Sequence, residues 1–269
     1  MKTIVITGCT SGIGEATTRE LLTKGNTIIG LVRNVDKANA LFEDSNTFEA
    51  IQCNLEDFKS IETASRILLE KDQEIDVLIN NAGAMFQSRQ NAISGFEKTL
   101  MVNYIGTFYL TKLLMPKLLK SKTRIVNISS GVHPRHKVNW NDLELKRKYS
   151  GITAYANSKL YVLWFAKLLH FKYHKYGLTA FAVHPGLIGS NFGDNLGAVG
   201  KLTWRIMKLF IKSNEQGAET SIYLASAKDV TYLSGKYVVD RKEEKPDSYA
   251  EDFDEANRLW EITEGWCPA

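Results

Sequence analysis

The sequence predicts one α/β domain built on a doubly wound parallel sheet of about seven strands. Short β-branched runs alternate with longer helical patterns along all 269 residues, as parallel strands joined by crossover helices require. No Pro/Gly/Ser-rich linker, internal repeat or low-complexity block interrupts this alternation. Residues 1–269 are therefore interpreted as a single domain.

The expected elements follow in order along the chain. The first strand leads into a helix over 12–24, and the runs at 76–79 and Arg124–Ile128 are apolar and compact enough to be central strands covered on both faces. The expected strands are Thr3–Thr7, Thr27–Val32, Phe48–Gln52, 76–79, Arg124–Ile128, 178–183 and 236–239. The other helices are expected near 57–71, 96–119, 154–174 and 217–226.

The composition is that of an ordinary globular protein, with 44% hydrophobic and 24% charged residues. It excludes disordered, collagen-like and coiled-coil chains. The 34 basic and 30 acidic residues give a net charge of +4 and are spread along the chain, without the basic stripe of a nucleic-acid-binding protein. We expect no nucleic-acid partner.

The cysteines and the hydropathy of the chain indicate the cellular compartment in which the protein is expected. Cys9, Cys53 and Cys267 show no metal-ligand spacing and are interpreted as free thiols of a reducing compartment. The chain starts directly in a strand-like stretch, with no charged-then-apolar leader. The most apolar segment, 160–171, is short and contains Lys167, so it is interpreted as a buried helix. We expect a cytoplasmic protein with no transmembrane segment.

Two long excursions, 131–151 and 186–213, follow the carboxyl ends of expected strands. Doubly wound sheets bind ligands at that edge, and long loops in compact domains tend to be functional. With 85–91, they are the expected substrate loops. The second contains an apolar stripe at helical spacing, formed by Leu202, Ile206, Leu209 and Phe210. Three interpretations of 199–212 stay open: a lid packed over an apolar substrate, a helix that contacts a membrane surface, or neither.

A glycine-rich segment, TGCTSGIG, separates the first strand from the first helix and contains Gly8, Gly12 and Gly14. Glycines let the backbone turn tightly and approach a pyrophosphate, and the helix N-terminus adds a favourable dipole. At this position in a strand–helix unit, the Gly-x3-Gly-x-Gly spacing predicts a dinucleotide site of the Rossmann type.

The residue after the second strand bears on cofactor choice. Arg33 stands where an NAD-specific site normally carries Asp or Glu, and Asp36 comes too late to replace it. An Arg there accommodates a 2′-phosphate, which favours NADP(H), with NAD(H) as the alternative. The other interpretation of Arg33 is a solvated surface side chain.

Further motifs recur in order along the chain. They are NNAG at 80–83, VNYIGTF at 102–108, IVNISS at 125–130, AYANSKL at 154–160, HPG at 184–186 and a GAETSIYLAS…SGKY tail. With TGCTSGIG, these motifs resemble the short-chain dehydrogenase/reductase family over nearly the whole chain, and most of all its retinol dehydrogenase-like branch. The resemblance implies a nicotinamide cofactor, an apolar carbonyl/alcohol substrate, and a homodimer through the helices that hold 104–119 and 155–173.

The same resemblance implies roles for individual residues. Asn80, Ala82 and Gly83 would support the sheet centre and flank the cofactor. Asn54 stands where an Asp commonly meets the adenine, and Asn34 replaces a frequent Asp beside the Arg. The implied cofactor-binding residues are Gly8, Thr10, Ser11, Gly12, Ile13, Gly14, Arg33, Asn54, Leu55, Asn81, Ala82, Gly83, Asn103, Tyr155, Lys159, Pro185, Gly186, Ile188 and Ser190.

The proton chemistry is assigned to one helix. Tyr155 and Lys159 lie four residues apart in a strongly helical stretch and so share a face. A nearby ammonium lowers the pKa of a Tyr, which predicts Tyr155 as the acid in carbonyl reduction and the base in alcohol oxidation. A serine at the end of the fifth strand is expected to hold the carbonyl oxygen, and the resemblance of IVNISS to the family favours Ser130 over Ser129. The resemblance implies that Asn103 organises a water chain behind Lys159.

Other candidate groups are weaker. A second Tyr-x3-Lys pair, Tyr232 and Lys236, spans a Ser-Gly turn and is interpreted as surface structure. His184 is expected to shape the nicotinamide pocket. The remaining histidines, 133, 136, 170 and 174, have no third ligand in the pattern, so no metal site is predicted.

The leading hypothesis is an NADP(H)-dependent oxidoreductase for an apolar retinal-, steroid- or aldehyde/ketone-like substrate. The alternatives are an NAD-preferring alcohol dehydrogenase, a non-catalytic dinucleotide-binding redox sensor and a sugar-nucleotide epimerase. A sensor usually loses the Tyr or the Lys, and an epimerase typically has a longer region after the last strand.

Overall fold

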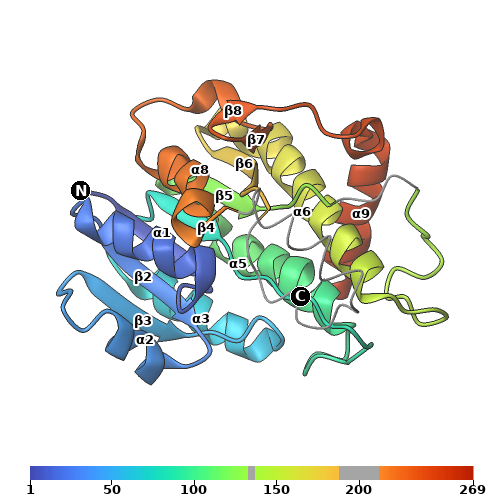
Figure 1. Cartoon of the computed structure of the whole chain (residues 1–269), viewed down its shortest axis with the longest axis horizontal. Helices are drawn as coiled ribbons and strands as arrows, with labels where there is room; N and C mark the ends of the chain where they lie inside the picture. The colour runs from blue at the N-terminus through green and yellow to red at the C-terminus, as the bar shows by residue number, and fades with distance from the viewer. Residues whose placement is uncertain (133–136, 188–211, 269) are drawn as a thin grey trace, which may run out of the picture.

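The computed structural model describes residues 1–132, 137–187 and 212–268, and these residues form an eight-stranded sheet (Figure 1). The strand order is β3-β2-β1-β4-β5-β6-β7-β8, in which only β8 is antiparallel to its neighbour. The strands are β1 Thr3–Thr7, β2 Thr27–Val32, β3 Phe48–Gln52, β4 Val77–Asn80, β5 Arg124–Ile128, β6 Thr179–His184, β7 Tyr237–Val239 and β8 Lys242–Glu243. The order reverses between β1 and β4, which is the switch point of a doubly wound sheet and confirms the predicted fold class.

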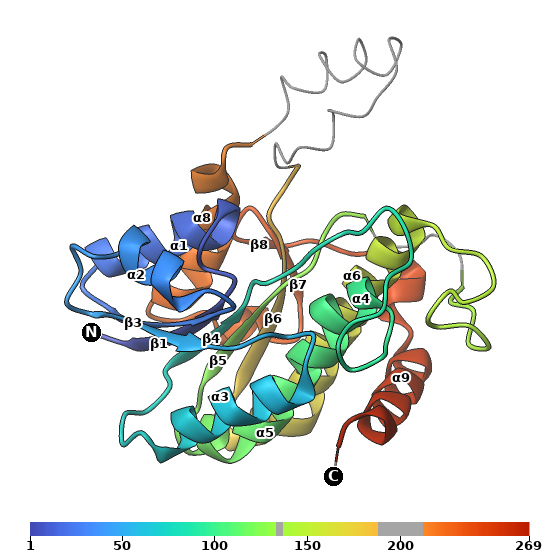
Figure 2. The same cartoon turned by 90° about the horizontal axis from the view of Figure 1, so that it is seen from below.

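Helices cover both faces of the sheet (Figure 2). On one face lie α1 Gly12–Thr23, α2 Val35–Leu41 and α8 Asn214–Ser226. On the other lie α3 Phe58–Glu70, α5 Gly106–Lys120 and α6 Gly151–Tyr173, with α9 Phe253–Trp266 packed outside α6. The shorter helices are α4 Lys98–Leu100, a π-helix Met101–Ile105, and 3-10 turns at His174–Tyr176, Thr231–Leu233 and Ser248–Glu251.

Strand side chains alternate between two hydrophobic cores. In β1, Ile4 and Ile6 enter the core beneath α1 and α8, whereas Val5 enters the core beneath α3, α5 and α6. This follows from the two-residue period of a strand. The seven expected strands lie within one residue of those observed, and burial on both faces explains this for β1, β2, β4, β5 and β6.

Three elements were not expected, and one of them, β8, raises the number of strands from about seven to eight. β8 has only two residues, both exposed, and is held by pairing with β7 rather than by any apolar pattern. The short helix α2 is capped at its N-terminus by Asn34, whose side chain accepts a hydrogen bond from the Lys37 N–H. The helix α9 is mostly polar and is capped in the same way by Asp252. Residues after 236 thus form more than a short tail.

The C-terminal helix α9 covers part of the face assigned to a homodimer. Trp260 packs against Phe108 of α5 and Phe165 of α6, with ring centroids 4.8 and 5.7 Å apart. The Thr263 hydroxyl donates to the Tyr104 hydroxyl oxygen at 3.1 Å. This face is therefore partly buried within the chain itself, and dimerisation stays a prediction. No helix within the described ranges is both long and apolar enough to span a membrane.

Replacing Trp260 with alanine is expected to lower the free energy of unfolding by about 3–5 kcal/mol, because it empties a buried site between two helices. Urea unfolding of the two proteins measures the difference. Ile93→Ala is the control, since the Ile93 side chain is 69% exposed and its loss is expected to cost less than about 1 kcal/mol. Equal losses in the two variants would contradict the packing role of α9.

Candidate active site

The turn between β1 and α1 forms a cradle that only glycine permits. Gly8 and Gly12 adopt positive φ angles of 68° and 58°. A Cβ at Gly14 would lie 2.1 Å from the Gly8 carbonyl oxygen. The N-cap of α1, Ser11, makes no side-chain cap hydrogen bond, unlike the N-caps of α2, α3, α6, α8 and α9. The first amides of α1 thus face an open site suited to an anion.

Asn81, expected at the cofactor, braces this cradle. Its side-chain amide donates to the carbonyl oxygens of Thr7 and Gly8, at 2.9 and 3.0 Å. The Thr7 hydroxyl oxygen accepts from the N–H groups of Asn81 and Ala82, both at 3.0 Å. These contacts tie the end of β1 to the end of β4, where the strand order reverses. Asn80 is buried and donates to Asn127 of β5, as expected for a residue that supports the sheet centre.

The end of β2 presents Arg33 to solvent. The guanidinium lies 3.6 Å from a carboxylate oxygen of Glu56, whose other oxygen lies 3.1 Å from the Lys98 ammonium. The Glu56 side chain is 9% exposed, so this acid is neutralised largely by Lys98. Glu56 and Lys98 were not found from the sequence, because three separated segments bring the charges together. Asn34 is occupied as the cap of α2.

Asn54 and Leu55, both predicted to bind the cofactor, lie in the segment that follows β3. The Asn54 side-chain oxygen accepts from the Glu56 N–H at 3.2 Å, which closes a turn after β3. Leu55 is buried, and its carbonyl oxygen would lie 2.5 Å from a Cβ at Gly106. Only glycine at the start of α5 permits this approach.

Tyr155, Lys159 and Ser130 meet at the carboxyl end of β5. Lys159 is 3% exposed, donates to the Ile128 carbonyl oxygen at 2.8 Å, and places its ammonium 5.6 Å from the centre of the Tyr155 ring. Burial lowers the pKa of Lys159 to about 8. The predicted helix face and the predicted strand end are thus brought together.

The pKa of Tyr155 runs opposite to the sequence-based expectation. Burial raises the pKa above its ordinary value, and a hydrogen bond with the Ser130 side chain opposes that rise. The Lys159 ammonium is directed to the Ile128 carbonyl rather than to the phenol. Desolvation therefore outweighs the lowering that a neighbouring ammonium was expected to produce.

The two serines are separated as the sequence favoured. Ser129 is buried, and its hydroxyl donates to the Lys159 carbonyl oxygen at 2.8 Å, so it anchors β5 to α6. Ser130 makes the contact with Tyr155. The second Tyr-x3-Lys pair is not assembled: Tyr232 is 64% exposed in a 3-10 turn, and Lys236 pairs with Glu243 at 3.0 Å.

Asn103 lies in the π-helix, where the Gly106 N–H donates to the Met101 carbonyl oxygen five residues earlier. Its side chain accepts from the Ala84 N–H at 2.8 Å and donates to the Ala84 carbonyl oxygen and the Ser158 hydroxyl, both at 2.9 Å. It is adjacent to Lys159: a Cβ at Gly83 would lie 3.2 Å from the Lys159 nitrogen and 3.5 Å from the Asn103 oxygen. The water chain stays a prediction.

The histidines serve local structure. Nδ1 of His184 accepts from the N–H groups of Gly131 and Gly186, at 3.0 and 3.3 Å, and so links two loops at the active edge. His170 contacts the Ser234 hydroxyl at 2.8 Å. No group of three potential metal ligands occurs within the described part of the chain.

The substrate side is only partly described. A pocket of about 490 Å³ beside Ser130 is lined by Gly131, His184, Tyr237 and 244–247. Residues 188–211, including Ile188, Ser190 and the stripe from Leu202 to Phe210, lie outside the described residues, as do His133 and His136.

Trp140, which the sequence places in a substrate loop, is partly buried and packs against the hydrophobic core. Its ring is parallel to that of Trp164 with centroids 6.4 Å apart, and the Arg258 guanidinium lies 4.4 Å from its centre. The loop that carries it is also held by a hydrogen bond from the Val138 N–H to the Tyr249 hydroxyl. The part of 131–151 around Trp140 is thus anchored on α6 and α9.

Comparison with known proteins gives concordant matches. The sequence profile of the short chain dehydrogenase family matches residues 2–199. Retinol dehydrogenase 12 of Mus musculus is 37% identical over 97% of this chain and 85% of its own length. Retinol dehydrogenase 13 of Homo sapiens is 35% identical over 96% of this chain and 82% of its own length. A crystal structure from Mycobacterium Paratuberculosis is similar with a TM-score of 0.81 and 30% identity, over 100% of this chain and 96% of that chain.

Proposed function

The chain belongs to the short-chain dehydrogenase family and is an NAD(P)-dependent oxidoreductase acting on CH–OH groups; we propose that it prefers NADP(H) and interconverts an apolar alcohol and its carbonyl compound. The observation that carries the proposal is that Ser130, Tyr155 and Lys159 meet at the same sheet edge as the glycine cradle. Parallel strands present their carboxyl ends, and the loops that follow, to one shared site.

The residues at this edge fit a dinucleotide. The glycine cradle and the uncapped N-terminus of α1 suit a pyrophosphate, and the exposed Arg33 suits a 2′-phosphate. When bound, the nicotinamide supplies or accepts the hydride. Ser130 holds the substrate oxygen by a hydrogen bond. Tyr155 gives its proton to that oxygen during reduction and takes it back during oxidation.

Lys159 keeps a positive charge beside Tyr155. The ammonium donates to the Ile128 carbonyl oxygen, which holds it near the Tyr155 ring. Its charge stabilises the phenolate that forms when Tyr155 gives up its proton. Asn103 holds Ala84 and Ser158 around this ammonium and so maintains its surroundings.

Two observations support an apolar substrate. Val132 and Leu187, at the loops joined by His184, are 43% and 50% exposed at the active edge. Two of the similar proteins are retinol dehydrogenases 12 and 13, and retinol is an apolar alcohol. Exposed aliphatic side chains at the mouth of a site favour apolar ligands.

The test is the oxidation of NADPH and of NADH with retinal, a steroid ketone, a medium-chain aldehyde and a quinone, with Tyr155→Phe assayed beside the wild type. Turnover with NADPH on an apolar carbonyl is expected. A preference for NADH would contradict the cofactor assignment alone. NADPH binding without turnover on any of the four compounds would contradict the proposed substrate class.

Replacing Arg33 with serine is expected to raise the KM for NADPH by about 10- to 100-fold, because a charge-assisted hydrogen bond to the 2′-phosphate is lost. The KM for NADH, which lacks that phosphate, is expected to change by less than about twofold. Initial rates at varied cofactor concentration measure both. Arg241→Ser is the control, since Arg241 forms an exposed ion pair with Glu219. An equal rise in both KM values would show that Arg33 does not recognise the 2′-phosphate of NADPH.

A further inference from the structure

The peptide bond between Ser130 and Gly131 is held by side chains on both of its edges. The Tyr237 hydroxyl donates to the Ser130 carbonyl oxygen at 3.1 Å. The Gly131 N–H donates to Nδ1 of His184 at 3.0 Å. The carbonyl oxygen and the amide hydrogen of a trans peptide point in opposite directions. The two contacts together therefore set the rotation of this peptide plane.

The two side chains come from neighbouring strands. His184 is the last residue of β6 and Tyr237 the first of β7, and their rings are parallel within 5°, with centroids 6.2 Å apart. The His184 ring also lies flush with Gly131, since a Cβ there would be 2.7 Å from Nε2. Nδ1 accepts from two N–H groups, those of Gly131 and Gly186, so it serves as the acceptor of this contact.

The contacts of Tyr237 and His184 lie just beyond the end of β5, where the chain leaves the sheet. β5 ends at Ile128, and Ser129 is still held by its N–H to the Val183 carbonyl oxygen and by its hydroxyl to Lys159. The next peptide no longer belongs to the sheet ladder. We infer that Tyr237 and His184 are positioning residues, which hold the Ser130–Gly131 peptide so that the Ser130 hydroxyl faces Tyr155. This inference rests on the proposed function.

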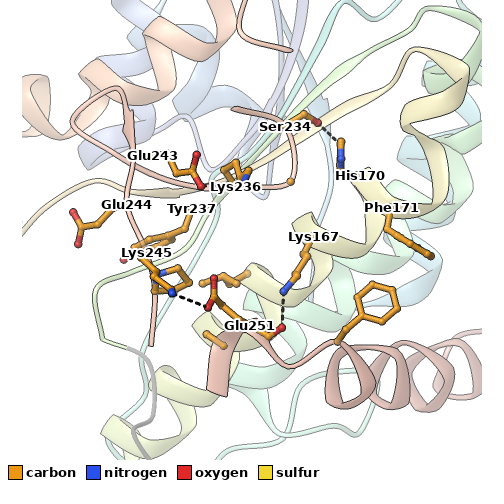
Figure 3. Close-up of a pocket in the computed structure, with 15 residues that line it drawn as sticks. Lys167, His170, Phe171, Ser234, Lys236, Tyr237, Glu243, Glu244, Lys245 and Glu251 are labelled. Carbon is orange, nitrogen blue, oxygen red and sulfur yellow. Dashed lines mark hydrogen bonds and ion pairs between the residues drawn. The ribbon is translucent and has the colours of Figure 1, made fainter. Parts of the chain in front are cut away.

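Tyr237 is suited to be a permanent donor. It is 5% exposed, and it lines both the pocket of about 490 Å³ and the larger cavity of Figure 3, where it lies among Glu244, Lys245 and Lys236. Burial raises the pKa of its hydroxyl well above the ordinary value, so the hydrogen is retained at working pH. Two lysines of the larger cavity are held by other residues of its lining: Lys236 pairs with Glu243, and Lys167 donates to the Glu251 carbonyl oxygen.

The first test removes only the hydroxyl. Tyr237→Phe is expected to lower kcat on the best substrate of the carbonyl panel by about 5- to 10-fold, while the KM for NADPH changes by less than about twofold. In a Ser130→Ala background the same substitution is expected to cause no further fall, because the residue it positions is gone. Tyr109→Phe is the matched control, since it removes a hydroxyl that donates to Glu62 at 2.8 Å. Equal falls with and without Ser130 would overturn the inference.

The second test concerns His184. Asparagine can place its side-chain oxygen where Nδ1 lies, so His184→Asn is expected to retain most of the wild-type kcat, whereas His184→Leu is expected to lose about 5- to 10-fold. Equal kcat values for the two variants would overturn the acceptor role.

Crystal structures of Tyr237→Phe and His184→Leu test the inference without any substrate. A rotated Ser130–Gly131 peptide supports it, and an unmoved peptide in both variants overturns it. Failure of the wild type to turn over any panel compound would count against the proposed function instead, and the crystal structures would still decide on the peptide.

Discussion

Replacing Tyr155 with phenylalanine is expected to lower kcat by about 10²- to 10⁴-fold, the usual contribution of a positioned acid or base. The hydroxyl is the only group removed, and it is the proposed proton source, in hydrogen-bond contact with Ser130. NADPH affinity, measured by fluorescence titration, is expected to change by less than about threefold, because the hydroxyl makes a minor part of the cofactor contact. A loss of affinity equal to the loss of kcat would assign Tyr155 to binding rather than to proton transfer.

Tyr232→Phe supplies the matched control. It makes the same change in the other Tyr-x3-Lys pair, where Tyr232 is exposed and its hydroxyl contacts that of Tyr223 at 3.2 Å. No change in kcat is expected there. If both variants lost activity alike, sequence spacing rather than the assembled site would be the better guide.

Replacing Lys159 with methionine is expected to stabilise the protein while lowering kcat by more than about 100-fold. At pH 7 the buried ammonium is charged, although burial has lowered its pKa from 10.5 to about 8. That shift corresponds to a penalty of about 3 kcal/mol. Loss of the hydrogen bond to the Ile128 carbonyl offsets about 1 kcal/mol of the relief. The net expected gain in the free energy of unfolding is about 1–3 kcal/mol.

The difference in the free energy of unfolding between Lys159→Met and the wild type is expected to depend on pH. Between pH 8 and 10.5 the unfolded chain keeps the Lys159 proton that the folded chain has released. The free energy of unfolding contributed by this residue therefore rises with pH across that window. The advantage of Lys159→Met is expected to shrink from pH 7 to pH 10, as measured by urea unfolding of both proteins at each pH.

Lys236→Met is the control for this series, since its side chain is 47% exposed and its removal is expected to change stability by less than about 0.5 kcal/mol at either pH. A destabilised Lys159→Met protein at pH 7 would show that the hydrogen bond outweighs desolvation.

Local patterns predicted the parts of the fold that repeat with a period. The central strands of the sheet are apolar runs covered on both faces, so their positions could be predicted within a residue. β8 carries no such pattern, because its two residues are exposed and are ordered by pairing with β7. The packing of Trp140 was also not predicted. It lies in a polar segment, and nothing in that segment predicts that its ring stacks on Trp164.

The candidate site divides in the same way. The sequence by itself determined the strand–glycine–helix cradle and the pairing of Tyr155 with Lys159 on one helix face, because each depends on neighbours within a few residues. The choice of Ser130 over Ser129 came from the family resemblance of IVNISS. Only the tertiary structure decided that burial raises the pKa of Tyr155, that Glu56 lies between Arg33 and Lys98, and that Tyr237 and His184 hold the Ser130–Gly131 peptide. The last contacts join residues 53 and 107 positions apart. Desolvation and hydrogen bonds across such separations depend on how distant segments pack, and they leave no period in the sequence.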